Sequence, residues 1–178
     1  MTERVDQRAI GEVPKDQDKA PARVRFTGRF PGKIDGKGRV LLPPAFRQKV
    51  EGGVFSFFPS LTEPVVQIGG PDFYDELLDL VLGIDEFDED RFLLEQMISQ
   101  RVIELGPDET GRVVLPKALA EHAEIDGVAG FAGRGSHFVL ASADYLDGLE
   151  AEALKAADRY ADVFKARMLP SIARGRRR

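Results

Sequence analysis

The stretch Asp35–Pro43 has the sequence DGKGRVLLP, and Asp108–Pro116 repeats it as DETGRVVLP, with six identities in nine positions at an offset of 73 residues. An aspartate that begins a turn accepts hydrogen bonds from the turn's backbone, and a glycine takes the positive φ that closes it. The pattern therefore predicts a strand, a tight turn and a second strand that ends at the proline, and it predicts this twice. The turn residues are Asp35, Gly38, Asp108 and Gly111.

The similarity between the two halves continues downstream with small shifts. Further matches are Phe57 with Phe131, Ile68 with Leu140, and Asp72-Phe73 with Asp144-Tyr145. This order predicts two copies of a unit of about 70 residues, each a β-hairpin plus helix. A single unit would expose strand edges and bury little, so we expect the two to interleave into one closed α+β barrel with a pseudo-two-fold axis, flanked by helices. That axis would bring the two turns together.

The rest of the chain follows from hydrophobic periodicity. We expect further strands at 25–30, 54–58, 65–68, 101–105, 128–132 and 137–140, and helices from Pro71, around Phe92–Ile98, at 118–123 and at 143–164. The predicted divisions are a mobile leader over 1–24, a first repeat with acidic helices over 25–98, a second repeat with a C-terminal helix over 99–165, and a basic tail over 166–178.

Composition excludes several kinds of protein. The 178 residues are 43% hydrophobic and 31% charged, which is typical of a globular chain and not of a disordered one. Cysteine is absent, so disulfides, cysteine-ligated metals and thiol nucleophiles are excluded. The sequence has no apolar run near 18 residues and begins with charged residues, so we expect no membrane span and a cytoplasmic protein.

The net charge of −5 hides a strong segregation of charge along the chain. Residues 1–49 hold 12 Lys or Arg and 6 acids, residues 50–90 hold 11 acids and no Lys or Arg, and residues 91–178 hold 13 of each. Because salt screens charges beyond roughly 8 Å, a local basic surface can persist on an acidic protein. A polyanionic partner and a set of merely solvated faces both remain open on charge alone.

Enzyme hypotheses find little support. Asp35 and Asp108 could form an acid dyad, but each has an arginine four residues on, with which it can pair and stay ionised. His122 and His137 are isolated, and two histidines alone do not make a metal site. The segment Gly32–Lys37 is one residue short of a phosphate-binding loop. We therefore predict no enzyme, no cofactor, no metal and no small-molecule substrate.

The same residues resemble a known family. Its motifs match Phe26-x-Gly28, DGKGR at 35–39, Leu42-Pro43, Phe46-Arg47, Asp108-x-x-Gly111-Arg112, Leu115-Pro116 and Gly133-Arg134-Gly135-x-x-Phe138. Between Phe26 and Tyr145 the chain resembles the MraZ family. That resemblance implies the swapped-hairpin barrel of AbrB-like and SpoVT-like regulators, assembly into homo-oligomeric rings, and a nucleoid-associated regulator of the division and cell-wall gene cluster. The implied partner is double-stranded DNA, at short G-rich promoter repeats upstream of the protein's own gene.

The resemblance also implies DNA-binding residues. Carried over by position, they are Lys33, Lys37, Arg39 and Arg47 in the first half, and Arg112 and Lys117 in the second. An arginine in the major groove can bind guanine, so Arg39 and Arg112 are expected at bases, and Lys33, Lys37 and Arg47 at phosphates. Two alternatives stay open: the turns are only hairpin braces, or the chain is an oligomeric scaffold or antitoxin-like interaction module.

Overall fold

The computed structural model describes residues 24–163 and 165. Except for Val24, the predicted leader lies outside the described residues, and so does the predicted basic tail over 166–178. Among the residues described, no helix is both long and apolar enough to cross a membrane.

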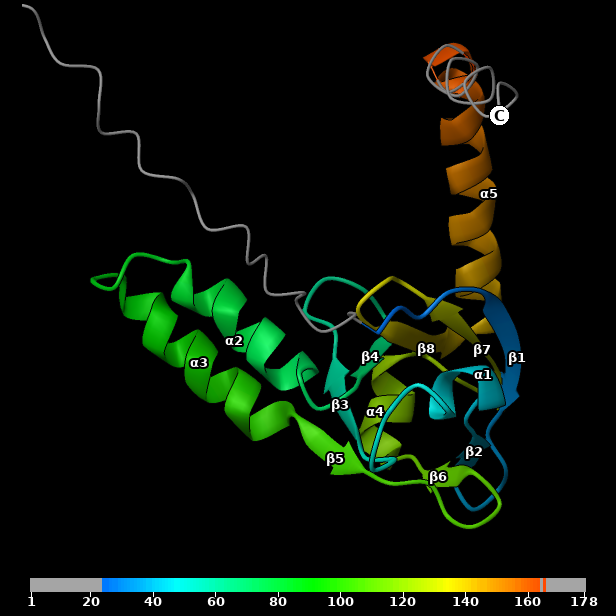
Figure 1. Ribbon diagram of the computed structural model, residues 1–178, viewed down its shortest axis with the longest axis horizontal. Coiled ribbons are helices and arrows are strands. Elements are labelled where there is room, and N and C mark those ends of the chain that lie inside the picture. Colours follow the sequence, from blue (N-terminus) through cyan, green and yellow to red (C-terminus); the bar gives the residue numbers. More distant parts are fainter. Residues whose placement is uncertain (1–23, 164, 166–178) are drawn as a thin grey trace, which may run out of the picture.

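In the described part of the chain, eight antiparallel strands form two sheets (Figure 1). The larger sheet has the order β1-β7-β8-β4-β3-β5, and β2 pairs with β6 in a separate two-stranded ribbon. The strands are β1 (Arg29–Lys33), β2 (Arg39–Leu41), β3 (Phe55–Pro59), β4 (Val66–Gly69), β5 (Ile103–Leu105), β6 (Arg112–Val114), β7 (Val128–Gly133) and β8 (Phe138–Ser142). With the helices, they confirm the prediction of a mixed α+β chain built on antiparallel sheets.

Five helices complete the described part of the chain: α1 (Pro44–Arg47), α2 (Phe73–Leu82), α3 (Glu89–Arg101), α4 (Lys117–His122) and α5 (Ala143–Arg159). The two short helices, α1 and α4, each follow a proline that ends a ribbon strand. The Ser142 hydroxyl caps α5 by accepting from the amide of Tyr145. In Figure 1, α2 and α3 form a hairpin that extends away from the sheets, and α5 extends in another direction.

The strand order is symmetric when the two sequence repeats are exchanged. The edge strand β1 of the first half pairs with β7 of the second, and the edge strand β5 of the second half pairs with β3 of the first. The ribbon has the same symmetry, because the amide of Leu42 donates to Gly111 at 3.0 Å and that of Leu115 donates to Gly38 at 2.8 Å. Each half therefore completes the sheet and the turn of the other.

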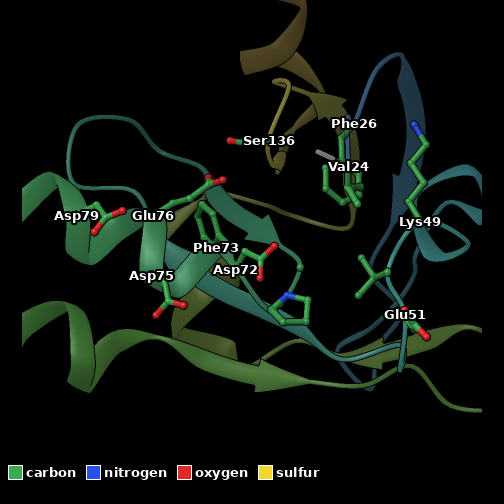
Figure 2. Close-up of a pocket in the computed structure, with 13 residues that line it drawn as sticks. Val24, Phe26, Lys49, Glu51, Asp72, Phe73, Asp75, Glu76, Asp79 and Ser136 are labelled. Carbon is green, nitrogen blue, oxygen red and sulfur yellow. The ribbon is translucent and has the colours of Figure 1, made fainter. Parts of the chain in front are cut away.

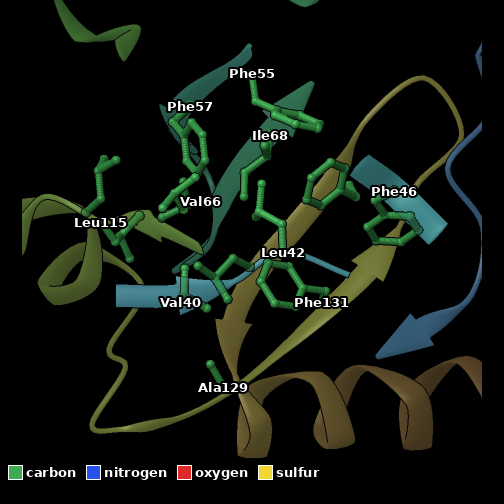
Figure 3. Close-up of a cluster of buried hydrophobic side chains, with 14 of the residues drawn as sticks. Val40, Leu42, Phe46, Phe55, Phe57, Val66, Ile68, Leu115, Ala129 and Phe131 are labelled. Carbon is green, nitrogen blue, oxygen red and sulfur yellow. The ribbon is translucent and has the colours of Figure 1, made fainter. Parts of the chain in front are cut away.

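The main core lies between these strands and draws on both halves (Figure 3). Val40 and Val113 point inward from the ribbon and are buried, as are Phe46 of α1 and Phe131 of β7. Phe26, Phe46 and Phe138 pack ring against ring, with centroids 4.5–5.5 Å apart. This shared core fixes the ribbon against the larger sheet.

Several predicted elements have different bounds in the structure. The strand expected at 101–105 begins at Ile103, because Arg101 still belongs to α3. The strand expected at 25–30 begins at Arg29, because Gly28 has φ +94° and interrupts it, so Phe26 makes only an isolated bridge with Gly135. The last helix, expected over 143–164, is interrupted at Tyr160, which has φ −105° and ψ 8°: α5 ends at Arg159, and residues 161–163 and 165 are helical again.

Candidate nucleic-acid interface

The outer face of the ribbon carries two arginines and two apolar side chains. Arg39 lies opposite Val114, and Leu41 lies opposite Arg112, while the pair between them, Val40 and Val113, points into the core. Because side chains alternate along a strand, burial of the two valines forces the other four outward. The arginines therefore occupy diagonal corners of one small face.

The first turn holds Arg39 through Asp35. One carboxylate oxygen accepts from the amides of Lys37 and Arg39, both at 2.9 Å, and the other accepts from Nε of Arg39 at 2.8 Å. These bonds, led by that from the Arg39 amide, lower the pKa of Asp35 to about 2. The predicted Asp35–Arg39 ion pair is thus present. In the described part of the chain, no hydrogen bond engages the two terminal nitrogens of Arg39, so they can meet a ligand.

The second turn has the same backbone but a different side-chain arrangement. Asp108 accepts from the hydroxyl of Thr110 at 2.7 Å and from the amide of Arg112 at 3.0 Å, which lowers its pKa. The guanidinium of Arg112 donates to the Thr110 hydroxyl at 2.8 Å. The prediction that Asp108 pairs directly with the Arg112 side chain is wrong, because the threonine, which replaces Lys37 of the first turn, lies between them.

A hollow of about 430 Å³ lies beside the ribbon. Lys33 and its neighbours on β1 form one side, and Arg39, Leu41 and Arg112 form the other, with Asp35 at the turn. Three of the six cations expected at DNA thus meet at one concave surface. At the repeat offset, Gly106 corresponds to Lys33, so the second half lacks that charge.

The other three expected cations do not line this hollow. Lys37 is exposed in the first turn. Lys117, at the start of α4, pairs with Glu121 at 3.1 Å. Arg47 donates from Nε to the carbonyl of Leu42 at 3.0 Å, and its guanidinium covers Gly111, within 2.3 Å of where a Cβ there would lie. Arg47 therefore supports the second turn from the first half of the chain.

Sequence reasoning missed two residues of this face, Leu41 and Val114. Their side chains are 44% and 61% exposed. The alternation of side chains along a strand could have indicated that they point outward, because each follows a valine that is buried in the core. Without the cross-strand register, however, the sequence does not place them beside the arginines.

A second pocket, of about 530 Å³, lies between α2 and the end of the described chain near Val24 (Figure 2). Asp75, Glu76 and Asp79 of α2 face it, and Lys49 lies on the opposite side. Since most of its charged side chains are acidic, this pocket is unsuited to a polyanion.

The structure offers little for the enzyme hypotheses. Asp35 and Asp108 each bond within their own turn, and the pKa of each is lowered, so both carboxylates stay ionised. His137 packs against the ring of Phe73 with centroids 5.3 Å apart, and burial lowers its pKa. Among residues 24–163 and 165, no group of three or more His, Asp or Glu side chains could hold a metal ion.

Comparison with known proteins gives the functional class. No protein-family model matches the chain. The transcriptional regulators MraZ of Rickettsia felis and Rickettsia africae are each 30% identical to it over 119 residues, which is 65% of this chain and 79% of the relative. MraZ of Rickettsia typhi is 29% identical over the same shares. These relatives are transcriptional regulators and not enzymes, as the prediction of no enzymatic activity requires.

These relatives place the chain, with its antiparallel α+β fold, in the class of transcriptional regulators. The chain belongs to the MraZ family. The resemblance seen in the sequence motifs is thereby confirmed.

Proposed function

We propose that the chain binds double-stranded DNA through the outer face of the β2–β6 ribbon and the hollow beside it. The observation that carries the proposal is the convergence of Lys33, Arg39 and Arg112 on one concave surface. The major groove admits a two-stranded ribbon, and an arginine there can bind O6 and N7 of guanine together. Lys33, with the more distant Lys37, Arg47 and Lys117, then adds contacts to phosphates.

The proposal extends to the target and the fold. The bound element is a set of tandem short G-rich repeats upstream of the protein's own gene, and the regulated genes are those of the division and cell-wall cluster, at the nucleoid. The fold is the swapped-hairpin barrel, a proposal supported by the exchange of edge strands between the halves. In this scheme the repeats at 25–98 and 99–165 form one body and not two domains.

We propose further that the protein works as a ring. One protomer offers few cations, so it binds a single repeat weakly, whereas a ring on tandem repeats makes the second contact intramolecular. The α2–α3 hairpin supplies a surface for such assembly, because Leu80, Phe87 and Phe92 are 73%, 87% and 62% exposed. These exposed side chains equally favour the second candidate function, an oligomeric scaffold that holds another protein.

The test is a fluorescence anisotropy titration of the full chain with DNA from upstream of its own gene and with a scrambled duplex. We expect tight, repeat-dependent binding that weakens steeply between low and physiological salt. Arg39→Ala and Arg112→Ala should abolish the preference, and Arg159→Ala, which removes the same charge at the end of α5, should not. Light scattering then reports whether assembly is intact.

Equal weak binding to both duplexes, or a flat response to salt, would contradict the DNA proposal and favour the scaffold. Loss of assembly in Arg39→Ala and Arg112→Ala, with the preference for the upstream duplex unchanged, would mean that the turns only brace the hairpins.

A further inference from the structure

The ribbon's outer face places branched apolar side chains between its arginines. Leu41 lies directly across from Arg112, and Val114 directly across from Arg39. Single exposed apolar residues are common on protein surfaces and need no explanation. Here, however, they make up half of a four-residue face that is otherwise cationic, and they occupy equivalent positions on the two strands. The pattern is one of alternating charge-bearing and apolar corners.

This pattern matches the chemistry of the major groove. Guanine presents two acceptors there, and thymine presents a 5-methyl group, the one apolar feature of the four bases. A surface that binds guanine through arginine therefore gains from an apolar neighbour only where a thymine methyl lies nearby. We infer that Leu41 and Val114 contact thymine methyl groups and so determine part of the DNA sequence that the ribbon binds. This inference rests on the proposed function.

The spacing limits where the thymine lies. Directly opposed side chains on antiparallel strands have Cβ atoms about 5 Å apart. Successive bases on one strand of DNA are about 3.4 Å apart. An arginine bound to guanine therefore sets its opposite apolar side chain one or two base steps away. The preferred element contains a thymine at that distance from a guanine, counted on either strand.

A second copy of the chain is a poorer occupant for this face. Two ribbons placed face to face would oppose arginine either to arginine, where like charges at short range repel, or to an apolar side chain, which would cover a charge without a partner. The acidic α2–α3 hairpin would be the complementary surface, and the experiment below distinguishes that case. A duplex offers both the negative charge and the methyl groups that the four side chains require.

The experiment compares thymine with uracil, which lacks only the 5-methyl group. The upstream duplex is prepared once with dTTP and once with dUTP, and each is titrated with the full chain. Loss of a buried methyl weakens binding about fourfold. We expect the wild type to bind the thymine duplex at least that much more tightly. Leu41→Ser and Val114→Ser should each reduce the thymine-to-uracil ratio, which is the affinity for the thymine duplex divided by that for the uracil duplex. The double variant should bind both duplexes equally.

Matched controls keep the test specific. Lys37→Ala should weaken binding to both duplexes equally and leave the thymine-to-uracil ratio unchanged. Circular dichroism melting and light scattering show that the serine variants fold and assemble as the wild type does. A Val114→Ala variant, which keeps an apolar side chain, should retain part of the ratio.

Three results would overturn the inference. If the wild type binds the two duplexes equally while Arg39→Ala abolishes binding, the ribbon binds DNA without methyl contacts, and only the inference fails. If the serine variants lose assembly and keep the thymine-to-uracil ratio, the face belongs to a protein interface. If the wild type prefers neither duplex to a scrambled one, the proposed function fails as well.

Discussion

Arg39 and Arg112 hold equivalent positions in the two repeats but have different partners. Asp35 fixes Arg39 through Nε, whereas Arg112 is fixed through one terminal nitrogen by Thr110. Arg39 therefore presents both terminal nitrogens to a ligand, as bidentate contact with guanine requires. To contact guanine in the same way, Arg112 must break its hydrogen bond to Thr110 or use the edge of its guanidinium that this bond does not occupy. The two halves of the ribbon are thus chemically unequal.

The first prediction concerns the pKa of Asp35, which NMR titration of its carboxyl group measures. It should be about 2 in the wild type, and Arg39→Gln should raise it while leaving it below the ordinary 3.8, since the amide bonds to the carboxylate persist. Because the pKa falls on folding, the stabilisation by Asp35 is complete above its unfolded pKa and is lost as pH drops from about 4 to about 2. An unchanged pKa in Arg39→Gln would contradict the ion pair.

The second prediction concerns the glycine of the second turn. Gly111 has φ +84°, where an alanine is strained by about 1–2 kcal/mol, and its methyl group would also displace the Arg47 guanidinium. Gly111→Ala should therefore lower the free energy of unfolding by that amount in urea denaturation. Gly36 is the matched control in the first turn, with no positive φ and nothing near its Cβ position. Equal effects of the two alanines would disprove the role of backbone strain.

Among the elements, the β3–β4 connection is tied to two distant parts of the chain. Glu63 accepts from both terminal nitrogens of Arg134, one at 2.9 Å, and from the hydroxyl of Tyr145 at 3.0 Å. The bonds from Arg134 are the main cause that lowers the pKa of Glu63. This cluster joins the β3–β4 connection, the β7–β8 turn and the start of α5.

The third prediction concerns how much the Glu63 cluster stabilises the fold. Glu63→Gln keeps the side-chain shape but removes the charge, and it should lower the free energy of unfolding by about 2 kcal/mol, because the pair is partly buried and bonds to charged groups are strong. Tyr145→Phe, which removes one bond and keeps Arg134 paired, should cost about 1 kcal/mol. Thermal or urea denaturation gives both values. If neither substitution lowers the free energy of unfolding, the cluster does not hold these three elements together.

The sequence predicted most elements, because the repeated turns and the alternating hydrophobic residues depend on local geometry. It did not predict where β1 begins, since that depends on the conformation of Gly28. The site was predicted only in part. Arg39 and Arg112 come together through the pairing of β2 with β6, which the pseudo-two-fold hypothesis anticipated, and the turn between β1 and β2 brings Lys33 to the same hollow. Leu41 and Val114 could not be assigned, because their role depends on cross-strand register.

Over the whole molecule, the segregation of charge along the sequence becomes a separation in space. The acidic residues of 72–90 lie on the α2–α3 hairpin, which extends away from the ribbon in Figure 1. With a screening length of about 8 Å at physiological salt, those carboxylates do little to weaken the positive potential at Arg39 and Arg112. A protein of net charge −5 can thus present a surface suited to DNA.

The central claim is that the two ribbon arginines bind guanine, and one substitution in the DNA tests it most directly. Replacing guanine by 7-deazaguanine in the upstream duplex removes the N7 acceptor and leaves base pairing intact. The wild type should bind the substituted duplex about tenfold or more weakly, since a bidentate contact is worth about 1–3 kcal/mol. Arg39→Ala with Arg112→Ala should bind both duplexes alike, and Arg159→Ala should behave as the wild type. Equal binding of the two duplexes by the wild type would contradict the account.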